Sequence, residues 1–231
     1  MTAVDGAAAS ITATASITAV CVVHEILPDP GQDPEFTAID KRPRPGRLAV
    51  GDLGLVDDTQ CDPVYHGGPD RALYAYAAED AAWWGQQLGR EVPAGLFGEN
   101  LQTSGLDVTG AEIGEQWRIG TGPDAVLVEV RAPRTPCVTF GRRMGEPRWV
   151  KRFAQAGRPG AYLRVLTPGS VAAGDPVQLV RRPGHGVGVG DVFPHPRPDA
   201  MRTLLGAADA GVLDLAPDVR TMAEQAVAAG R

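Results

Sequence analysis

The sequence predicts a mainly β fold, a β-barrel with a few flanking helices and a small helical appendage at the C-terminus. Composition supports many short elements, because the 231 residues include 29 glycines and 20 prolines. Strand-like runs also outnumber helix-like runs up to residue 182. A closed or partly open barrel therefore fits the pattern better than a parallel sheet built from βαβ units.

The strands are predicted from short runs of apolar and β-branched residues that turn residues separate. In chain order these runs cover 19–23, 73–76, 113–119, 126–130, 161–166 and 177–180. Stretches rich in Asp, Pro and Gly predict loops over 28–34 and 42–46. Gly120 to Asp124 has the composition of a hairpin turn between two of the strands.

Helices are predicted where apolar residues recur at helical spacing. Ala78 to Leu88 is the first, and Pro147 to Gly157 is the second, with a proline at its start, a glycine at its end and an apolar face opposite a basic one. Ala- and Leu-rich helices are expected over 200–208 and 217–229.

The predicted organisation has four parts, because composition changes near each boundary. They are a flexible N-terminal tail over 1–18, a β-barrel domain over 19–182, a Gly/Pro-rich linker over 183–198 and a helical appendage over 199–231. The tail lacks the basic start and apolar stretch of a secretory signal. No run approaches the roughly 20 apolar residues of a membrane-spanning helix, so no membrane association is expected.

Charge and cysteine content restrict the function classes. A net charge of -6 argues against general binding to nucleic acid or anionic membranes. Nine basic residues nevertheless lie from Arg131 to Arg164 against one acid, Glu146, which indicates either an anion-binding segment or a solvated basic helix face. The three cysteines form no CxxC motif, which fits a reducing cytoplasm better than a disulfide scaffold.

Cys137 is the strongest candidate for a functional residue. It follows the run Ala132–Pro136, whose prolines restrict the backbone and whose arginine favours the thiolate, the form that binds metals and attacks electrophiles. A buried structural cysteine is the alternative, and it is the expected state of Cys21. Two more polar clusters with glycines, 66–70 and 97–101, predict one site assembled from loops.

Five segments together resemble the MOSC family, the domain named after the C-terminal part of molybdenum cofactor sulfurase, and in particular its small stand-alone bacterial members. They are Thr37–Lys41, His66–Ala72, Gly95–Leu101, Pro133–Cys137 and Gly160–Val165. The helical tail resembles a shortened form of the three-helix extension of some members. One departure is Asp57, where the family more often has glycine.

The resemblance implies a pyruvate-kinase-like β-barrel whose cleft binds molybdenum cofactor (molybdopterin), a pterin dithiolene that carries a phosphate. It also implies that Cys137 ligates molybdenum or carries a sulfane sulfur. A soft thiolate suits this metal, and the basic segment suits a phosphate. Pyridoxal phosphate is not expected, because the domain that binds it in full-length sulfurases has no counterpart here.

The candidate site residues divide into two groups, each with a structural alternative. The catalytic candidates are Cys137, also the metal ligand, with His66, Asn100 and Glu99 as hydrogen-bonding or proton-transfer groups. The cofactor-binding candidates are Gly67, Gly68, Arg71, Gly98, Arg134, Thr135 and Arg164. The alternatives are a turn cap for His66, loop backbone partners for Asn100 and Glu99, and a surface ion pair for Arg71.

The leading hypothesis is a cytoplasmic oxidoreductase that reduces N-hydroxylated small molecules, such as hydroxylamino compounds, at a Cys137-ligated molybdenum. No flavin, iron–sulfur or nicotinamide motif is visible, so an external flavin or iron–sulfur redox partner is expected. The alternative is a sulfur carrier that transfers persulfide sulfur from Cys137 to a cofactor or metal centre. A third hypothesis is a cofactor carrier without turnover.

Overall fold

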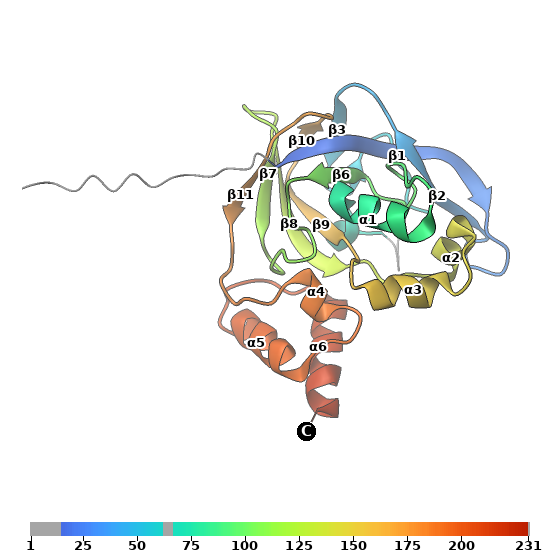
Figure 1. Cartoon of the computed structure of the whole chain (residues 1–231). Helices are drawn as coiled ribbons and strands as arrows, with labels where there is room; N and C mark the ends of the chain where they lie inside the picture. The colour runs from blue at the N-terminus through green and yellow to red at the C-terminus, as the bar shows by residue number, and fades with distance from the viewer. Residues whose placement is uncertain (1–14, 62–66, 231) are drawn as a thin grey trace, which may run out of the picture.

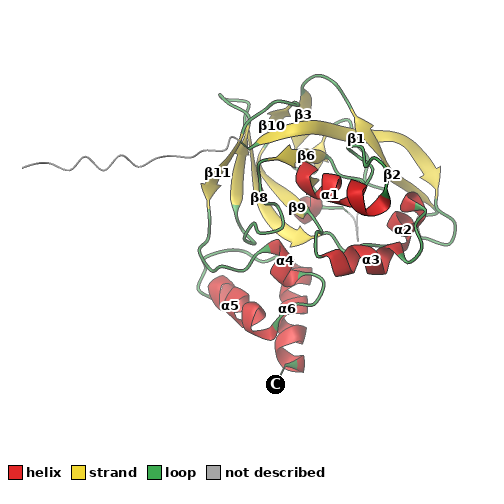
Figure 2. Cartoon of the chain, viewed as in Figure 1, coloured by secondary structure: helices red, strands yellow, loops and turns green. Residues whose placement is uncertain are grey.

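The structure is a computed structural model that describes residues 15–61 and 67–230. Most strands belong to one eight-stranded sheet in the order β11-β7-β8-β9-β5-β6-β1-β2, and a three-stranded sheet has the order β10-β3-β4 (Figures 1 and 2). The strands are β1 (Ser16–Pro28), β2 (Phe36–Pro43), β3 (Leu48–Gly51), β4 (Gly54–Leu55), β5 (Leu73–Ala77), β6 (Leu101–Ser104), β7 (Gln116–Ile119), β8 (Val126–Pro133), β9 (Ala161–Thr167), β10 (Gly169–Val171) and β11 (Val177–Arg181).

Helices cover one side of the large sheet and form the C-terminal part of the chain (Figure 2). They are the 3-10 helix η1 (Pro69–Arg71), then α1 (Ala78–Leu88), α2 (Val138–Met144), α3 (Trp149–Ala156), α4 (Val189–Val192), α5 (Pro198–Asp209) and α6 (Pro217–Ala229). The limits of α1 and α6 are those that the sequence predicted. Among the described residues, no helix has the length and apolar character needed to cross a bilayer.

The prediction of a β-barrel was wrong. The large sheet is open, with β11 at one end and β2 at the other, and it is mixed, because β5 and β6 are parallel while the other pairs are antiparallel. β1 forms its ladders with β6 and β2. Between β1 and the segment before β11, the described residues form the isolated bridge of Ser16 with Pro176 and backbone hydrogen bonds of Ile17 with Gly174 and Asp175, but no ladder.

Several element limits differ from the predicted ones. β1 begins at Ser16, within the segment 1–18 that was expected to be a tail. β8 continues to Pro133 and therefore extends to within a few residues of Cys137. Eight elements of the described residues were not predicted, namely β2, β3, β4, η1, β6, β10, α2 and α4.

The core has two parts. One hydrophobic cluster joins the sheet to α5 and α6, so that Val128 of β8 and Leu204 of α5 belong to the same buried group. The other is aromatic and lies under α1, α2 and α3, where Trp84 and Phe153 stack at 5.9 Å between ring centroids. Trp84, Trp117 and Trp149 are at most 2% exposed, as expected for packing residues.

Gly160, just before β9, allows the aromatic cluster to approach the backbone closely. Its φ is 66°, and an added Cβ would lie 2.6 Å from the carbonyl oxygen of Ala75 and 2.7 Å from the Tyr74 and Tyr76 rings.

We expect Gly160→Ala to lower the free energy of unfolding by about 3 kcal/mol, since backbone strain and overpacking add. Gly157→Ala is the matched control, because its φ is 64° and nothing lies within 4 Å of its added Cβ. For Gly157→Ala, urea denaturation should show that the free energy of unfolding falls by about 1 kcal/mol. Equal losses of unfolding free energy in both variants would contradict this packing argument.

Arg131 connects the helical appendage to the sheet. Its side chain is 0% exposed, and it donates to Asp70 at 2.7 Å, to Glu129 at 2.8 Å and to Asp214 at 3.2 Å. Arg164 reaches the same two aspartates, Asp70 at 2.6 Å and Asp214 at 3.0 Å. The segment before α6 and the η1 segment are therefore held by one charge network that centres on β8 and β9.

Candidate functional site

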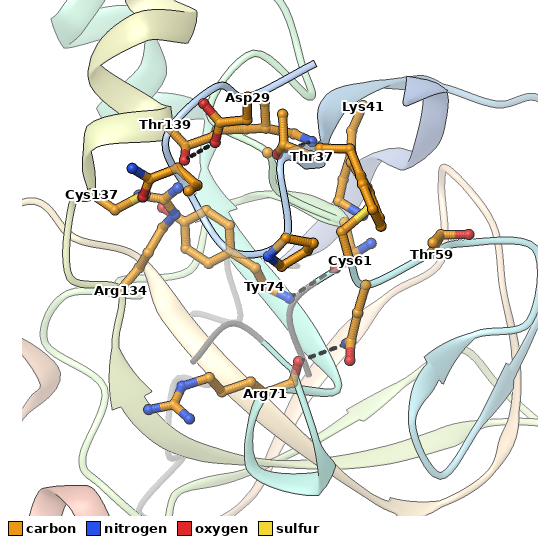
Figure 3. A pocket seen from close by; sticks show the side chains of 18 of the residues that line it. Asp29, Thr37, Lys41, Thr59, Cys61, Arg71, Tyr74, Arg134, Cys137 and Thr139 are labelled. Atoms are coloured by element: carbon orange, nitrogen blue, oxygen red, sulfur yellow. Dashed lines mark hydrogen bonds between the residues drawn. The ribbon is translucent and has the colours of Figure 1, made fainter. Parts of the chain in front are cut away.

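A pocket opens between the β1–β2 connection, the segment before η1 and the start of α2 (Figure 3). The empty space of the pocket, counted together with the open solvent at its mouth, is about 890 Å³. The residues that line it are Asp29, Gln32, Asp33, Pro34, Phe36, Thr37, Ala38, Ile39, Lys41, Thr59, Gln60, Cys61, Arg71, Tyr74, Gly98, Asn100, Arg134, Cys137, Thr139 and Tyr162. All five of the family-like segments thus contribute to one cavity, although residues 67–70 of the predicted polar cluster do not line it.

Cys137 lines this pocket from the first turn of α2. It is the N-cap residue of that helix, with an extended backbone at φ -119° and ψ 175°, and its side chain is half-buried. β8 ends four residues earlier at Pro133. The two prolines of the intervening run keep the chain extended, so the thiol faces the cavity while α2 continues away from it.

Arg134 forms the adjacent wall of the pocket. It is 5% exposed, and its guanidinium lies 4.2 Å from the centroid of the Phe140 ring and 5.5 Å from that of Tyr74. Its buried Nη1 has no hydrogen-bond partner among the described residues. Burial acts to lower the pKa of Arg134, but nearby Tyr162, Tyr74, Cys137 and Glu99 raise it overall. A buried, charged donor without an acceptor is suited to an anionic ligand.

Asn100 lines the pocket, but its amide is used by the fold. Its Oδ1 accepts from the Tyr74 backbone N–H at 3.2 Å, and its Nδ2 donates to the Cys21 carbonyl at 3.3 Å and to Asp58 at 2.7 Å. Asp58 in turn forms an ion pair with Lys41, whose side chain is 10% exposed. Lys41 is a pocket residue that sequence reasoning did not select, although it lies in one of the family-like segments.

Glu99 lies behind the pocket and is not among its lining residues. It is 2% exposed, and its carboxyl accepts from the backbone N–H groups of Gly95 at 2.7 Å and Phe97 at 3.1 Å. Burial raises the pKa of Glu99 from 4.5 to about 7, although these hydrogen bonds and Arg134 act to lower it. Its environment therefore favours the protonated carboxyl below neutral pH.

We expect this carboxyl to make stability depend on pH. Because the pKa is higher in the folded state, the unfolded chain releases this proton first as pH rises, and the free energy of unfolding should fall between pH 4.5 and about 7. The contribution amounts to about 3 kcal/mol across this range. Urea denaturation at several pH values should show a smaller fall for Glu99→Gln than for the parent. Identical pH profiles for both proteins would contradict the raised pKa.

Four more predicted residues lie at or near the pocket. Gly98 lines it with a φ of 80°, and an added Cβ there would lie 3.2 Å from Ile39. Arg71 lines it as well and forms an ion pair with Asp218 of α6. Gly68, with a φ of 85°, is the N-cap of η1, and the buried Gly67 precedes it. His66 lies outside the described residues.

Two predicted residues lie outside the lining of the pocket. Thr135 is exposed, and the guanidinium of Arg164 is held by Asp70 and Asp214. Most arginines of the basic segment likewise form ion pairs with carboxylates of this chain; these are Arg131, Arg142, Arg143, Arg152, Arg158 and Arg164. Arg134 differs from them because no carboxylate pairs with it in the described part of the chain.

The two other cysteines have different environments. Cys21 is 0% exposed, and burial raises its pKa to about 12, which agrees with the predicted core position. Cys61 lines the pocket, where burial raises its pKa. Within residues 15–61 and 67–230, no group of three His, Cys, Asp or Glu side chains is arranged to hold a metal ion.

Comparison with known proteins agrees with the sequence resemblance. The model of the MOSC domain matches residues 62–178. The uncharacterized protein YflK of Bacillus subtilis is 36% identical over 153 residues, which are 66% of this chain and 67% of YflK. A protein named reductase from Gibberella moniliformis is 33% identical over 150 residues, which are 64% of this chain and 26% of that protein. The crystal structure of YiiM from Geobacillus stearothermophilus superposes with a TM-score of 0.71 at 26% identity, covering 92% of this chain and 98% of YiiM.

Proposed function

The chain belongs to the MOSC domain family, and we propose that it binds molybdenum cofactor in the pocket beside Cys137 and reduces N-hydroxylated small molecules there. The proposal depends mainly on one observation, that two chemically suitable side chains lie in the same wall of the pocket. Cys137 contributes a half-buried thiol to this wall. Arg134 contributes a buried guanidinium with an unpartnered N–H, and both residues line the cavity.

The residues of the pocket fit this cofactor. A phosphate needs a cation with hydrogen-bond donors, and Arg134 has an unsatisfied Nη1. The dithiolene brings two sulfur ligands of its own, so one protein thiolate is a sufficient addition, and the lack of a clustered metal site in the described residues is consistent with this. The pocket is open to solvent on one side, so a ligand can enter it beside these residues.

Each of these residues has a task that its surroundings support. Two-electron cleavage of an N–O bond is the chemistry that the cofactor supplies when it is bound. Cys137 would hold the metal through its sulfur, from a backbone that two prolines restrict and next to the charge of Arg134. Lys41 is held by Asp58 at the pocket wall, from where its ammonium can donate a proton to the departing oxygen.

An external electron donor completes the proposed reaction. The relative named reductase suggests this activity class, and the matched region is 26% of the length of that protein. No flavin, iron–sulfur or nicotinamide motif is visible in the sequence. We therefore propose a separate flavin or iron–sulfur protein as donor and the reducing cytoplasm as location.

The test is reduction of a hydroxylamino compound by protein loaded with molybdenum cofactor, with dithionite as electron source. We expect amine formation by the parent and none by Cys137→Ala, while urea denaturation of the two proteins agrees within about 1 kcal/mol. Equal turnover by both proteins would contradict a role for this thiol. Cyanide-releasable sulfur on Cys137 without turnover would favour the sulfur carrier instead.

A further inference from the structure

The outer side of α2 and α3 carries a surface of exposed apolar and basic side chains, which we call the docking face. It consists of Val138 and Arg142 on α2, Arg148 at the N-cap of α3, and Val150 and Lys151 on α3. Val138 is 54% exposed and Val150 is 38% exposed. Both are large apolar side chains left at the surface next to basic groups.

These residues form one continuous surface. Val138 and Arg142 are four residues apart on α2 and therefore share a helix face. An added Cβ at Gly141, between them in sequence, would lie 3.6 Å from Cγ2 of Val150, so α3 continues the same surface. Figure 1 shows α2 and α3 side by side at the edge of the molecule, next to the end of β2.

The docking face is positive although the chain as a whole carries a net charge of -6. Arg148 and Lys151 are exposed, and within the described ranges neither side chain forms an ion pair. Arg142 forms an ion pair with Asp29, but that carboxylate is 5% exposed while the arginine is 46% exposed. The positive charge therefore faces solvent and the negative charge faces the interior.

The docking face adjoins the pocket directly. Cys137 and Thr139 line the cavity, whereas Val138 between them points to solvent. Asp29 is itself a pocket residue and accepts hydrogen bonds from Thr139 and Arg142 of α2. One turn of helix thus separates the thiol of the site from the exposed basic surface.

We propose that the docking face binds an acidic electron-carrier protein that reduces the pocket's cofactor, an inference that rests on the proposed function. Reduction of an N-hydroxyl group to an amine uses two electrons and two protons and releases water, so a carrier must deliver two electrons for each turnover. Apolar residues surrounded by arginine and lysine are typical of such an interface, and opposite charge accelerates the encounter.

The test compares two electron sources for the same loaded enzyme. Electron transfer from reduced flavodoxin, an acidic flavin protein, requires docking to the enzyme, whereas electron transfer from dithionite does not. We expect the double variant Arg148→Glu and Lys151→Glu to lower kcat/KM for flavodoxin about 10-fold or more at low ionic strength. Its dithionite-supported rate should remain that of the parent. The flavodoxin rate of the parent should also fall as salt rises.

A matched control separates local from general charge effects. Arg202→Glu with Arg220→Glu makes the same charge change at an exposed position of α5 and a half-buried position of α6, and it should leave the flavodoxin rate near that of the parent. Equal loss in both double variants would overturn the docking face. The docking face is also overturned if reduced flavodoxin supports no turnover of the parent while dithionite does. It is overturned as well if sedimentation shows that the parent is a dimer and that the Arg148→Glu and Lys151→Glu variant is not. Absence of turnover with dithionite would contradict the proposed function itself.

Discussion

Arg131→Met should destabilise the protein by about 3–5 kcal/mol, the largest stability change that we expect from one side chain. The guanidinium is 0% exposed and neutralises Asp70, Glu129 and Asp214. Methionine keeps much of the volume of the arginine side chain. The loss of unfolding free energy therefore measures the effect of leaving these three carboxylates without their cationic partner. Thermal or urea denaturation measures the effect directly.

The position of this network also predicts where the structure should loosen. Asp70 belongs to η1, and Asp214 lies between α5 and α6, so both should be held less firmly in the variant. Hydrogen exchange should increase over 67–72 and 212–219 and remain unchanged in α1. A stability loss below about 1 kcal/mol would show that Arg164 alone neutralises these carboxylates.

Arg134→Met should have the opposite profile, a large loss of anion binding with little change in stability. Arg134 is 5% exposed and its Nη1 is unpartnered, and no carboxylate of the described residues forms an ion pair with it, so its removal leaves none of them without a partner. Charged hydrogen bonds of this kind contribute about 1.5–3 kcal/mol, which corresponds to a 10- to 100-fold weaker affinity. Titration calorimetry with inorganic phosphate measures the binding change.

The two arginines serve as controls for each other. They lie three residues apart, both are buried, and the substitution is the same. We expect Arg131→Met to unfold more easily but to bind phosphate with the parent's affinity while folded. A stability loss in Arg134→Met as large as that in Arg131→Met, or unchanged phosphate affinity, would show that Arg134 is structural.

The secondary structure was predictable where local composition decides it. β8 and β9 are runs of β-branched and apolar residues, and α1 and α6 have clear helical spacing. β2 was missed because it contains Asp40 and Lys41, whose charges are buried only because Arg143 and Asp58 neutralise them. Such pairing partners are far away in sequence.

Closure of the sheet could not be predicted in the same way. Whether the ends of a sheet meet depends on the tilt and register of strands that are distant in sequence, here β2 and β11. Composition favours a barrel and an open mixed sheet equally. The family resemblance was confirmed, but the barrel that it implied was not, since the large sheet ends at β11 and β2.

The candidate site was partly predictable from residue type. Cys137, Arg134, Asn100, Gly98 and Arg71 line one pocket, as their chemistry suggested. Sequence patterns did not indicate which arginines are already paired, and so Arg134 and Arg164 seemed equivalent. Lys41 was missed because a single lysine in a strand carries no distinctive pattern.

The most direct test of the central claim is the molybdenum content of the protein after expression in a host that makes the cofactor. We expect close to one metal atom per chain in the parent, and little or none in Cys137→Ala purified in the same way. Retained metal in the variant would contradict ligation by Cys137. A parent without metal, under conditions that load another molybdenum enzyme, would contradict the proposed function.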